Sequence, residues 1–317
     1  MDRASGSQTP PADARAPVDG PAASGGSLKR SLVNFIPVAT LVAVVLGWML
    51  APRSITESPW SILIAGVVTS FFLLGLEQLF ERHEGWRLNK IEFATDLFYM
   101  VLMYTVIGWA VEVLADGPLA SLKEMLGITT PWVTALPFVL QVALVIFLIE
   151  FGQYWMHRAM HNWYPLWLTH APHHHITQLN ALKGFVGNPI ELFLISLSVV
   201  ALFDFDIVAL FCALNVLGVI SGYAHANIRS DPPLVYSFVF TTIRHHSLHH
   251  TALSYEDTRC NYANSLILID RIFGTYREGE SAIVGQDERK RLSIYEQFMF
   301  PFQPLIDKYK SRRSTSA

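Results

Sequence analysis

Long apolar stretches separated by short polar segments occupy the first two thirds of the chain. The stretches 35–51 and 60–76 form one closely spaced pair, and 93–115 and 135–149 form a second pair. A bilayer core requires roughly 20 apolar residues per helix. Each of these four stretches therefore predicts a transmembrane helix.

The fifth apolar stretch, residues 190–221, is too long for a single span. Asp204 and Asp206 interrupt it midway, which predicts two shorter helices arranged as a shallow hairpin. We therefore expect an all-α, polytopic membrane protein. It would have four transmembrane helices, the shallow helical hairpin, and a cytoplasmic helical cap.

The composition supports a membrane protein. Hydrophobic residues make up 51% of the 317 residues and charged residues only 15%, whereas soluble domains are about 25% charged. A net charge of −3 gives no basis for nucleic-acid binding. Cys212 and Cys260 lie far apart and form no disulfide or metal-binding pattern. Residues 1–27 are rich in Ala, Pro, Gly and Ser, which predicts a disordered tail rather than a signal peptide.

The basic residues predict the orientation of the spans. The segments before the first span and between the second and third contain Lys29, Arg30, Arg82, Arg87 and Lys90. The opposite loops contain only Arg53 and Lys123. The positive-inside rule then places the N-terminus and the 81–92 loop in the cytoplasm. Each later hairpin returns the chain to the same side.

Nine of the twelve histidines fall into three short motifs and one single position. The motifs are HRAMH at 157–161, HAPHH at 170–174 and HSLHH at 246–250, and the single residue is His225. Imidazoles three or four residues apart share one face of a helix, and neutral imidazole binds Fe, Zn, Cu and Ni. One ion takes about four to six ligands, so nine candidates predict two metal ions. The predicted ligands are His157, His161, His170, His173, His174, His225, His246, His249 and His250.

Chance clustering or loose binding by an exposed tract is the alternative explanation. It is disfavoured because the motifs are embedded in Trp, Tyr and apolar residues. The predicted topology also places all nine histidines in one compartment. The other histidines fit no motif: His83 in a charged loop is expected to be solvated, and His175 and His245 adjoin ligands as possible outer partners.

Three acidic residues, Asp96, Glu77 and Glu150, lie in or near the predicted spans, and we expect different surroundings for them. Asp96 lies near the start of the third span and could hydrogen-bond a ligand histidine. Glu77 and Glu150 lie at predicted cytoplasmic ends, where we expect them to reach water or lipid headgroups.

The ligand types narrow the chemistry. Carboxylate-bridged metal pairs in helical bundles use Glu and Glu-x-x-His motifs, which are missing near these histidines. The first motif also lacks the Glu of a His-Glu-x-x-His zinc hydrolase. An all-imidazole pair beside a membrane favours O₂ activation on a lipid. A membrane metal-binding or transport protein without redox chemistry is the alternative, although transporters place their ligands within the spans.

The histidine motifs resemble those of the fatty acid hydroxylase/sterol desaturase family of integral-membrane di-iron enzymes. YWMHRAMH at 154–161 is similar to the first family motif, and the motifs at 170–174 and 246–250 to later ones. NY at 261–262 and DRIFGTY at 270–276 resemble the family's ending. The resemblance covers residues 92–277. It implies two Fe ions, which Zn could replace in purified samples, and O₂-dependent hydroxylation or desaturation of a lipid.

The chain departs from the family pattern at two positions. Asn188 stands where many members have His, and Thr241-Thr242 where many have Thr-Pro. Asn188 could therefore leave one iron with a weaker outer partner. Asn227, two residues after His225, could orient a group at the metal or simply form a turn.

Substrate and electrons must come from outside the chain. The spans imply a membrane lipid, whose class the residue pattern does not distinguish. The chain has no fused haem, iron–sulfur or dinucleotide-binding motif, which predicts a separate ferredoxin- or cytochrome-type donor. Trp155, Trp163, Tyr164 and Trp167 predict an interfacial aromatic belt or a pocket wall.

The expected organisation follows from these patterns. It comprises a tail (1–27), an N-terminal transmembrane hairpin with its cytoplasmic loop (28–92), a hydroxylase-like catalytic domain (93–280) and a C-terminal cytoplasmic tail (281–317).

Overall fold

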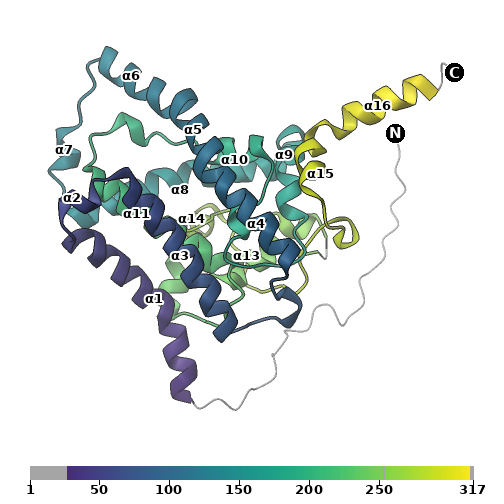
Figure 1. Ribbon diagram of the computed structural model, residues 1–317, viewed down its shortest axis with the longest axis horizontal. Coiled ribbons are helices and arrows are strands. Elements are labelled where there is room, and N and C mark those ends of the chain that lie inside the picture. The colour runs from purple at the N-terminus through teal and green to yellow at the C-terminus, as the bar shows by residue number, and fades with distance from the viewer. Residues whose placement is uncertain (1–26, 253, 315–317) are drawn as a thin grey trace.

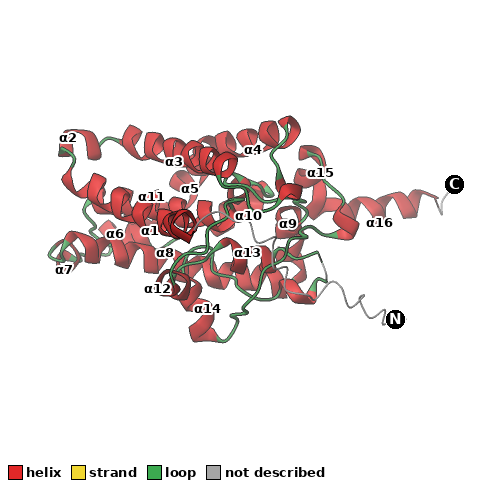
Figure 2. Ribbon diagram, turned by 90° about the horizontal axis from the view of Figure 1, so that it is seen from below, coloured by secondary structure: helices red, strands yellow, loops and turns green. Residues whose placement is uncertain are grey.

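The computed structural model describes residues 27–252 and 254–314. Most of the predicted N-terminal tail lies outside these residues. Within the described part the fold is helical, and its only β pairings are two isolated antiparallel bridges, Glu81 with Ile228 and Thr251 with Val284 (Figure 2). The prediction of an all-α membrane protein is therefore confirmed.

Five helical segments of the described chain are long and apolar enough to cross a membrane (Figure 1). Four are single helices: α1 (Ser27–Leu50), α3 (Pro59–Leu79), α8 (Phe138–Asn162) and α11 (Ile207–His225). The fifth runs from Lys90 to Met125 through α4 (Lys90–Leu102), α5 (Gly108–Val111) and α6 (Gly117–Met125), joined by the π-helical turns η3 (Met103–Ile107) and η4 (Glu112–Asp116).

Shorter helices connect and cover the long ones. On the side away from the histidines they are α2 (Arg53–Thr56), α7 (Pro131–Thr134) and η6 (Val200–Leu202). Around the histidines they are η2 (Glu84–Trp86), α9 (Tyr164–His174), η5 (Lys183–Phe185), α10 (Pro189–Ile195), α12 (Leu234–Val239), α13 (Ile243–His249), η7 (Glu256–Thr258) and α14 (Ile267–Phe273). The C-terminal part forms η8 (Asp287–Arg289), α15 (Ile294–Met299), η9 (Phe300–Phe302) and the projecting α16 (Gln303–Ser314).

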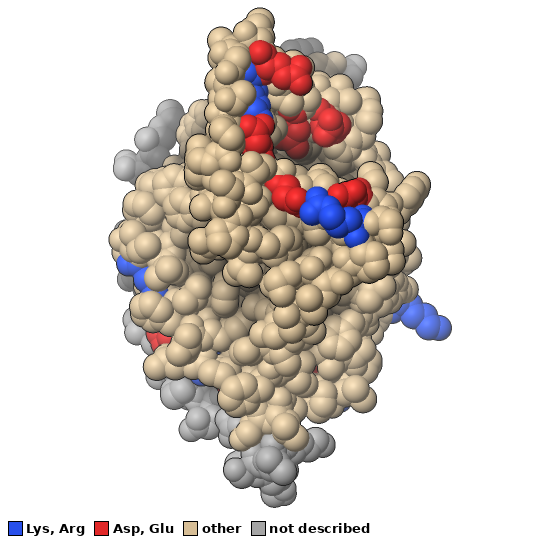
Figure 3. Space-filling view, turned by 90° about the vertical axis from the view of Figure 1, so that its left-hand side faces the viewer, with Lys and Arg blue, Asp and Glu red and all other residues tan. Residues whose placement is uncertain are grey.

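The fifth apolar stretch differs from the expected pair of short helices. Its first limb consists of the short α10 and η6, but its second limb, α11, has 19 residues. The Asp206 side chain accepts from the backbone N–H of Val208, which caps α11 at its start. Asp204 pairs with Lys123 and accepts from the backbone N–H of Thr130 at 2.6 Å. The tip of the hairpin therefore reaches the loops at the ends of the other spans. Figure 3 shows the molecule from this end, where a few clusters of acidic and basic side chains interrupt a largely uncharged surface.

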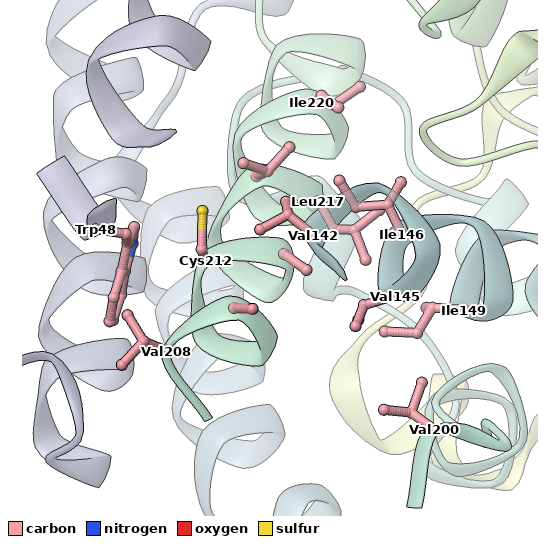
Figure 4. Close-up of a cluster of buried hydrophobic side chains, with 13 residues drawn as sticks. Trp48, Val142, Val145, Ile146, Ile149, Val200, Val208, Cys212, Leu217 and Ile220 are labelled. Carbon is pink, nitrogen blue, oxygen red and sulfur yellow. The ribbon is translucent and has the colours of Figure 1, made fainter. Parts of the chain in front are cut away.

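Helix α11 is the central helix of the bundle. In the most apolar stretch of α11, 67% of the residues are buried inside the protein, whereas the corresponding share in the other four candidate spans is 17–39%. Its apolar side chains, including Cys212 and Leu217, pack with Val145 of α8 and Trp48 of α1 (Figure 4). The Trp48 indole also donates to Asn215 of α11 at 3.0 Å. This packing fixes the C-terminal end of α11, and hence His225, relative to its neighbours.

Candidate metal centre

The nine predicted ligands lie at the C-terminal ends of four helices. His157 and His161 occupy the last turns of α8, and His225 is the last residue of α11. The other six lie near the ends of α9 and α13, with His250 as the C-cap of α13. Helix C-termini carry partial negative charge, which stabilises a nearby cation by about 0.3–1 kcal/mol each. Four such ends converge on this region.

The histidines separate into two buried groups. Within each group the candidate ligand nitrogens all lie within 4.8 Å of one another. The first group consists of His157, His161, His170, His174 and His249, and the second of His173, His225, His246 and His250. The two groups adjoin, because the rings of His174 and His250 stack with centroids 4.5 Å apart.

The spacing of the nitrogens fits bound metal ions. In the first group the Nε2 of His170 lies 2.9 Å from that of His157, 3.1 Å from that of His161 and 3.0 Å from that of His174. In the second, the Nε2 atoms of His225 and His246 are 2.8 Å apart. Two imidazoles at about 2.1 Å from one ion, at a right angle, would place their nitrogens about 3.0 Å apart. Each group therefore has the spacing of a single ion's ligands.

Backbone carbonyls orient several of the rings. The Nδ1–H of His157 donates to Tyr262 at 2.6 Å, and that of His249 donates to Cys260 at 2.7 Å. In the second group, His173 donates to Val186 at 2.6 Å and His225 to Ser221 at 2.8 Å. A proton held on Nδ1 leaves the lone pair of Nε2 free for a metal. Within the described residues, the Nδ1 atoms of His174, His246 and His250 have no such partner.

A carboxylate orients one ring of the first group. The Nδ1 of His170 donates to Glu191 Oε1 at 2.6 Å. Glu191 also accepts from the backbone N–H of Asn188 at 3.2 Å, and the Asn188 side chain caps α10 in return. Sequence reasoning did not select Glu191. The signal was present in the Asn-Pro-Ile-Glu sequence at 188–191, because Asn and Glu at this spacing form a capping box.

Burial keeps the imidazoles in the form that binds metals. All nine are at most 7% exposed. Desolvation lowers the pKa of His170 to about 3 and those of His246, His249 and His250 well below the ordinary value. The rings are therefore neutral at physiological pH, as ligation requires.

Comparison with known proteins agrees with this geometry. Residues 142–275 match the fatty acid hydroxylase family model. This part of the chain is therefore similar to the fatty acid hydroxylase family, and we refer to it as the hydroxylase-like domain. All nine histidines lie inside the matched residues, and the five apolar helices support an integral membrane protein.

Curated relatives carry out oxidations on different lipids. The chain is 29% identical over 150 residues to ornithine lipid hydroxylase OlsE from Rhizobium tropici, which is 46% of this chain and 44% of the relative. It is 30% identical to human alkylglycerol monooxygenase, over 43% of this chain and 31% of the relative. The identity is also 30% with a Δ7-sterol-C5(6)-desaturase from Nicotiana tabacum, over 45% of this chain and 52% of the relative. The chain thus aligns with about a third to a half of each relative. No solved structure matches it.

Two further histidines lie beside the candidate ligands but outside both groups. His175 donates from Nδ1 to the Ala171 carbonyl at 2.7 Å, and its Nε2 lies 3.1 Å from Asp287. His245 lies 3.3 Å from the Thr242 hydroxyl. Within the described residues neither ring contacts a ligand histidine by hydrogen bond.

Three polar residues in or near the hydroxylase-like domain have contacts that differ from expectation. Glu77 and Glu150 do not reach water, because they are 5% and 1% exposed and accept backbone N–H groups. Asp96 binds Lys183 and Asn180 rather than a histidine.

The expectation that His83 is simply solvated is also wrong. Its Nε2 lies 2.7 Å from Glu280, and its backbone N–H and carbonyl both bind the Asn227 side chain. The Asn227 amide is therefore engaged by the 81–84 loop, which agrees with a scaffold role.

Asn188 joins the residues that match the family model to the C-terminal part of the chain. Its Nδ2 donates to the carbonyls of Gln297 and Phe298 at 2.9 and 3.1 Å. It contacts no ligand ring directly and acts on His170 only through Glu191.

The four aromatic residues between the motifs divide into two sets. Trp155, Trp163 and Tyr164 are 42–63% exposed, as expected for an interfacial belt. Trp167 instead lies against the rings of His161 and His174, with centroids 5.3 and 5.5 Å apart. Trp167 therefore forms part of the wall around the first histidine group.

Proposed function

We propose that this protein is a membrane-bound di-iron oxygenase that hydroxylates or desaturates an unactivated C–H bond of a lipid. The observation that carries the proposal is the pair of adjoining, buried, all-histidine groups within the hydroxylase-like domain. The match to the fatty acid hydroxylase family model and the names of the similar lipid-modifying enzymes support the reaction class. Iron is favoured over zinc because the reaction consumes O₂ and electrons.

The protein's own residues would bind and orient the metals. The five histidines of the first group would hold one iron and the four of the second group the other, and the pair would supply O₂ activation. Hydrogen bonds fix the orientation of five of the rings. Their acceptors are Glu191 and the backbone carbonyls of Tyr262, Cys260, Val186 and Ser221. Burial of the rings excludes water, which protects a reactive centre from side reactions.

The surface near the second group is suited to a membrane substrate. Helix α12 exposes Leu234 and Val235, each 80% accessible, and Phe238, which is 49% accessible. Three residues after α12 ends, α13 begins and leads to His246. An exposed aliphatic helix this close to the ligands could admit a lipid from the adjoining leaflet.

Orientation and electron supply complete the proposal. We place the histidine groups and the N-terminus on the cytoplasmic side, because the loop beside them carries Arg82, Arg87 and Lys90. A separate ferredoxin- or cytochrome-type protein would supply electrons. The chain's two cysteines are both buried and are too few for a four-cysteine iron–sulfur cluster.

The decisive experiment compares lipids made with active and inactive protein. Cells carrying the gene, lacking it, or carrying His249→Ala would be profiled by mass spectrometry for lipids heavier by one oxygen or lighter by two hydrogens. We expect such a product only with the unchanged gene and only under O₂. An identical profile in all three strains would contradict the proposal.

Metal transport is the competing function. It predicts metal flux across vesicles containing the purified protein and no O₂ consumption. The clustering of all nine ligands at the ends of helices, with no further group of three or more ligands in the part of the chain that the structure describes, favours the oxygenase.

A further inference from the structure

One segment, residues 180–186, lies directly behind the second histidine group; we call it the supporting segment. Its Val186 carbonyl accepts the Nδ1–H of His173 at 2.6 Å. Gly184 faces His225 so closely that a Cβ added there would lie 3.3 Å from the His225 Cε1. Two of the four ligands in this group therefore rest on the supporting segment.

Buried charges hold the supporting segment in place. Lys183 is 1% exposed, and its Nζ donates to Asp96 at 2.7 Å and pairs with Glu92. The Asn180 side chain donates to the other oxygen of Asp96 at 2.8 Å. Lysine is almost never fully buried unless it is paired, and an unpaired buried charge is strongly destabilising. The position of Lys183, and with it the segment, is therefore tied to α4.

Two further contacts anchor the same segment. Glu77 of α3 accepts the backbone N–H of Ala181 at 2.7 Å and that of Asn227 at 2.9 Å, so it joins the segment to the chain just after His225. Arg291 pairs with Glu92 from the C-terminal part. Each of the three side chains Glu77, Glu92 and Arg291 lies outside residues 142–275, the hydroxylase match.

The first histidine group is supported differently. His157 and His249 donate to the carbonyls of Tyr262 and Cys260, and His170 donates to Glu191. These three supports all lie within residues 142–275. None of these three supports belongs to the supporting segment, which contacts His173 and His225 of the second group.

We propose that the buried ion cluster of Glu92, Asp96 and Lys183 positions His173 and His225 through the supporting segment and thereby sets the metal affinity of the second group alone. The inference rests on the two-metal part of the proposed function but not on lipid oxidation. Glu92, Asp96 and Lys183 are positioning residues, since none of them contacts a ligand ring by hydrogen bond.

The test measures zinc affinity in the purified full-length protein, loaded with Zn²⁺ in detergent and titrated with a chelator. Asp96→Asn keeps the size of the side chain but removes the charge opposite Lys183. We expect one of two ions to be released at about 10–100-fold lower chelator concentration, as for the loss of other outer partners. The other ion should be released as in the unchanged protein.

Reference variants identify the site that weakens. His161→Ala removes a ligand of the first group and His250→Ala one of the second, so the Asp96→Asn profile should resemble that of His250→Ala. Asp307→Asn, in the exposed part of α16, is the matched control and should leave both ions unchanged.

A second variant keeps the test decisive if Asp96→Asn does not fold. Gly184→Ala leaves the ion cluster intact but presses a methyl group against His225, and it should also weaken one ion selectively. Unchanged affinity for both ions, or weakening of the first group instead, would overturn the proposal. Because no lipid or O₂ is present, the result does not depend on whether the protein proves to be an oxygenase.

Discussion

The replacement of Glu191 by Gln tests how much one outer partner contributes to the first histidine group. The carboxylate accepts two N–H groups, from His170 at 2.6 Å and from the backbone of Asn188 at 3.2 Å. Gln has nearly the same shape, but its amide presents an oxygen to only one of these donors. The variant therefore loses the charge and one of the two hydrogen bonds.

The expected loss of metal affinity follows from the strength of these hydrogen bonds. A hydrogen bond to a charged group contributes about 1.5–3 kcal/mol and a neutral one about 0.5–1.5 kcal/mol. Replacing the charged Glu191 acceptor of His170 by a neutral amide should thus weaken metal binding by about 1–1.5 kcal/mol, or roughly tenfold in affinity. Glu191→Ala removes the partner entirely and should cost up to about 100-fold.

Chelator competition on the zinc-loaded protein measures the effect, and α15 provides the control. Glu296 forms the same capping box with Ser293, but its side chain is 43% exposed and pairs with Lys290 rather than with a histidine. Glu296→Gln should therefore leave both ions unchanged, whereas Glu191→Gln should weaken only the ion of the first group. If Glu191→Gln binds both ions as tightly as the unchanged protein, the hydrogen bond to His170 does not tune the site and the reasoning fails.

Three other predictions address the ligands, the scaffold and the pH dependence. His249→Ala should abolish lipid oxidation and lower the metal content measured by mass spectrometry, whereas His245→Ala should retain about two ions per chain; equal losses would contradict the assignment of the groups. Asn227→Asp removes the donor to the 81–84 loop and should lower thermal stability by about 1 kcal/mol with unchanged metal content, and a loss of metal instead would place the amide at the site. Burial raises the pKa of Glu280, but Arg82 and the neighbouring histidine outweigh it and hold the pKa at about 2, below the ordinary 4.5. Its contribution to stability should be complete above about pH 4.5 and be lost as the pH falls through 2, so melting curves of Glu280→Gln should show a weaker acid dependence than those of the unchanged protein.

Local sequence patterns were sufficient to predict the helical fold and to select the nine histidines that the structure brings together. Apolar stretches of span length depend only on composition along the chain, and all four predicted spans correspond to apolar helical segments in the structure. Spacings of three and four residues place imidazoles on one helix face, whatever the rest of the fold does. The number of candidate ligands by itself predicted two metal ions, and the predicted hairpins led us to expect all of these ligands at one membrane face.

The tertiary structure decided how the ligands are shared and supported. Successive helix residues point about 100° apart, so His173 and His174 enter different groups, as do His249 and His250. Which neighbour joins which group depends on the packing of four helices, and no local pattern encodes it. The contacts of Asp96 with Lys183 and of Asn227 with the 81–84 loop join residues 87 and 144 positions apart. Such pairs meet only when distant segments pack together, because burial forces each charged or polar group to find a partner wherever the fold supplies one.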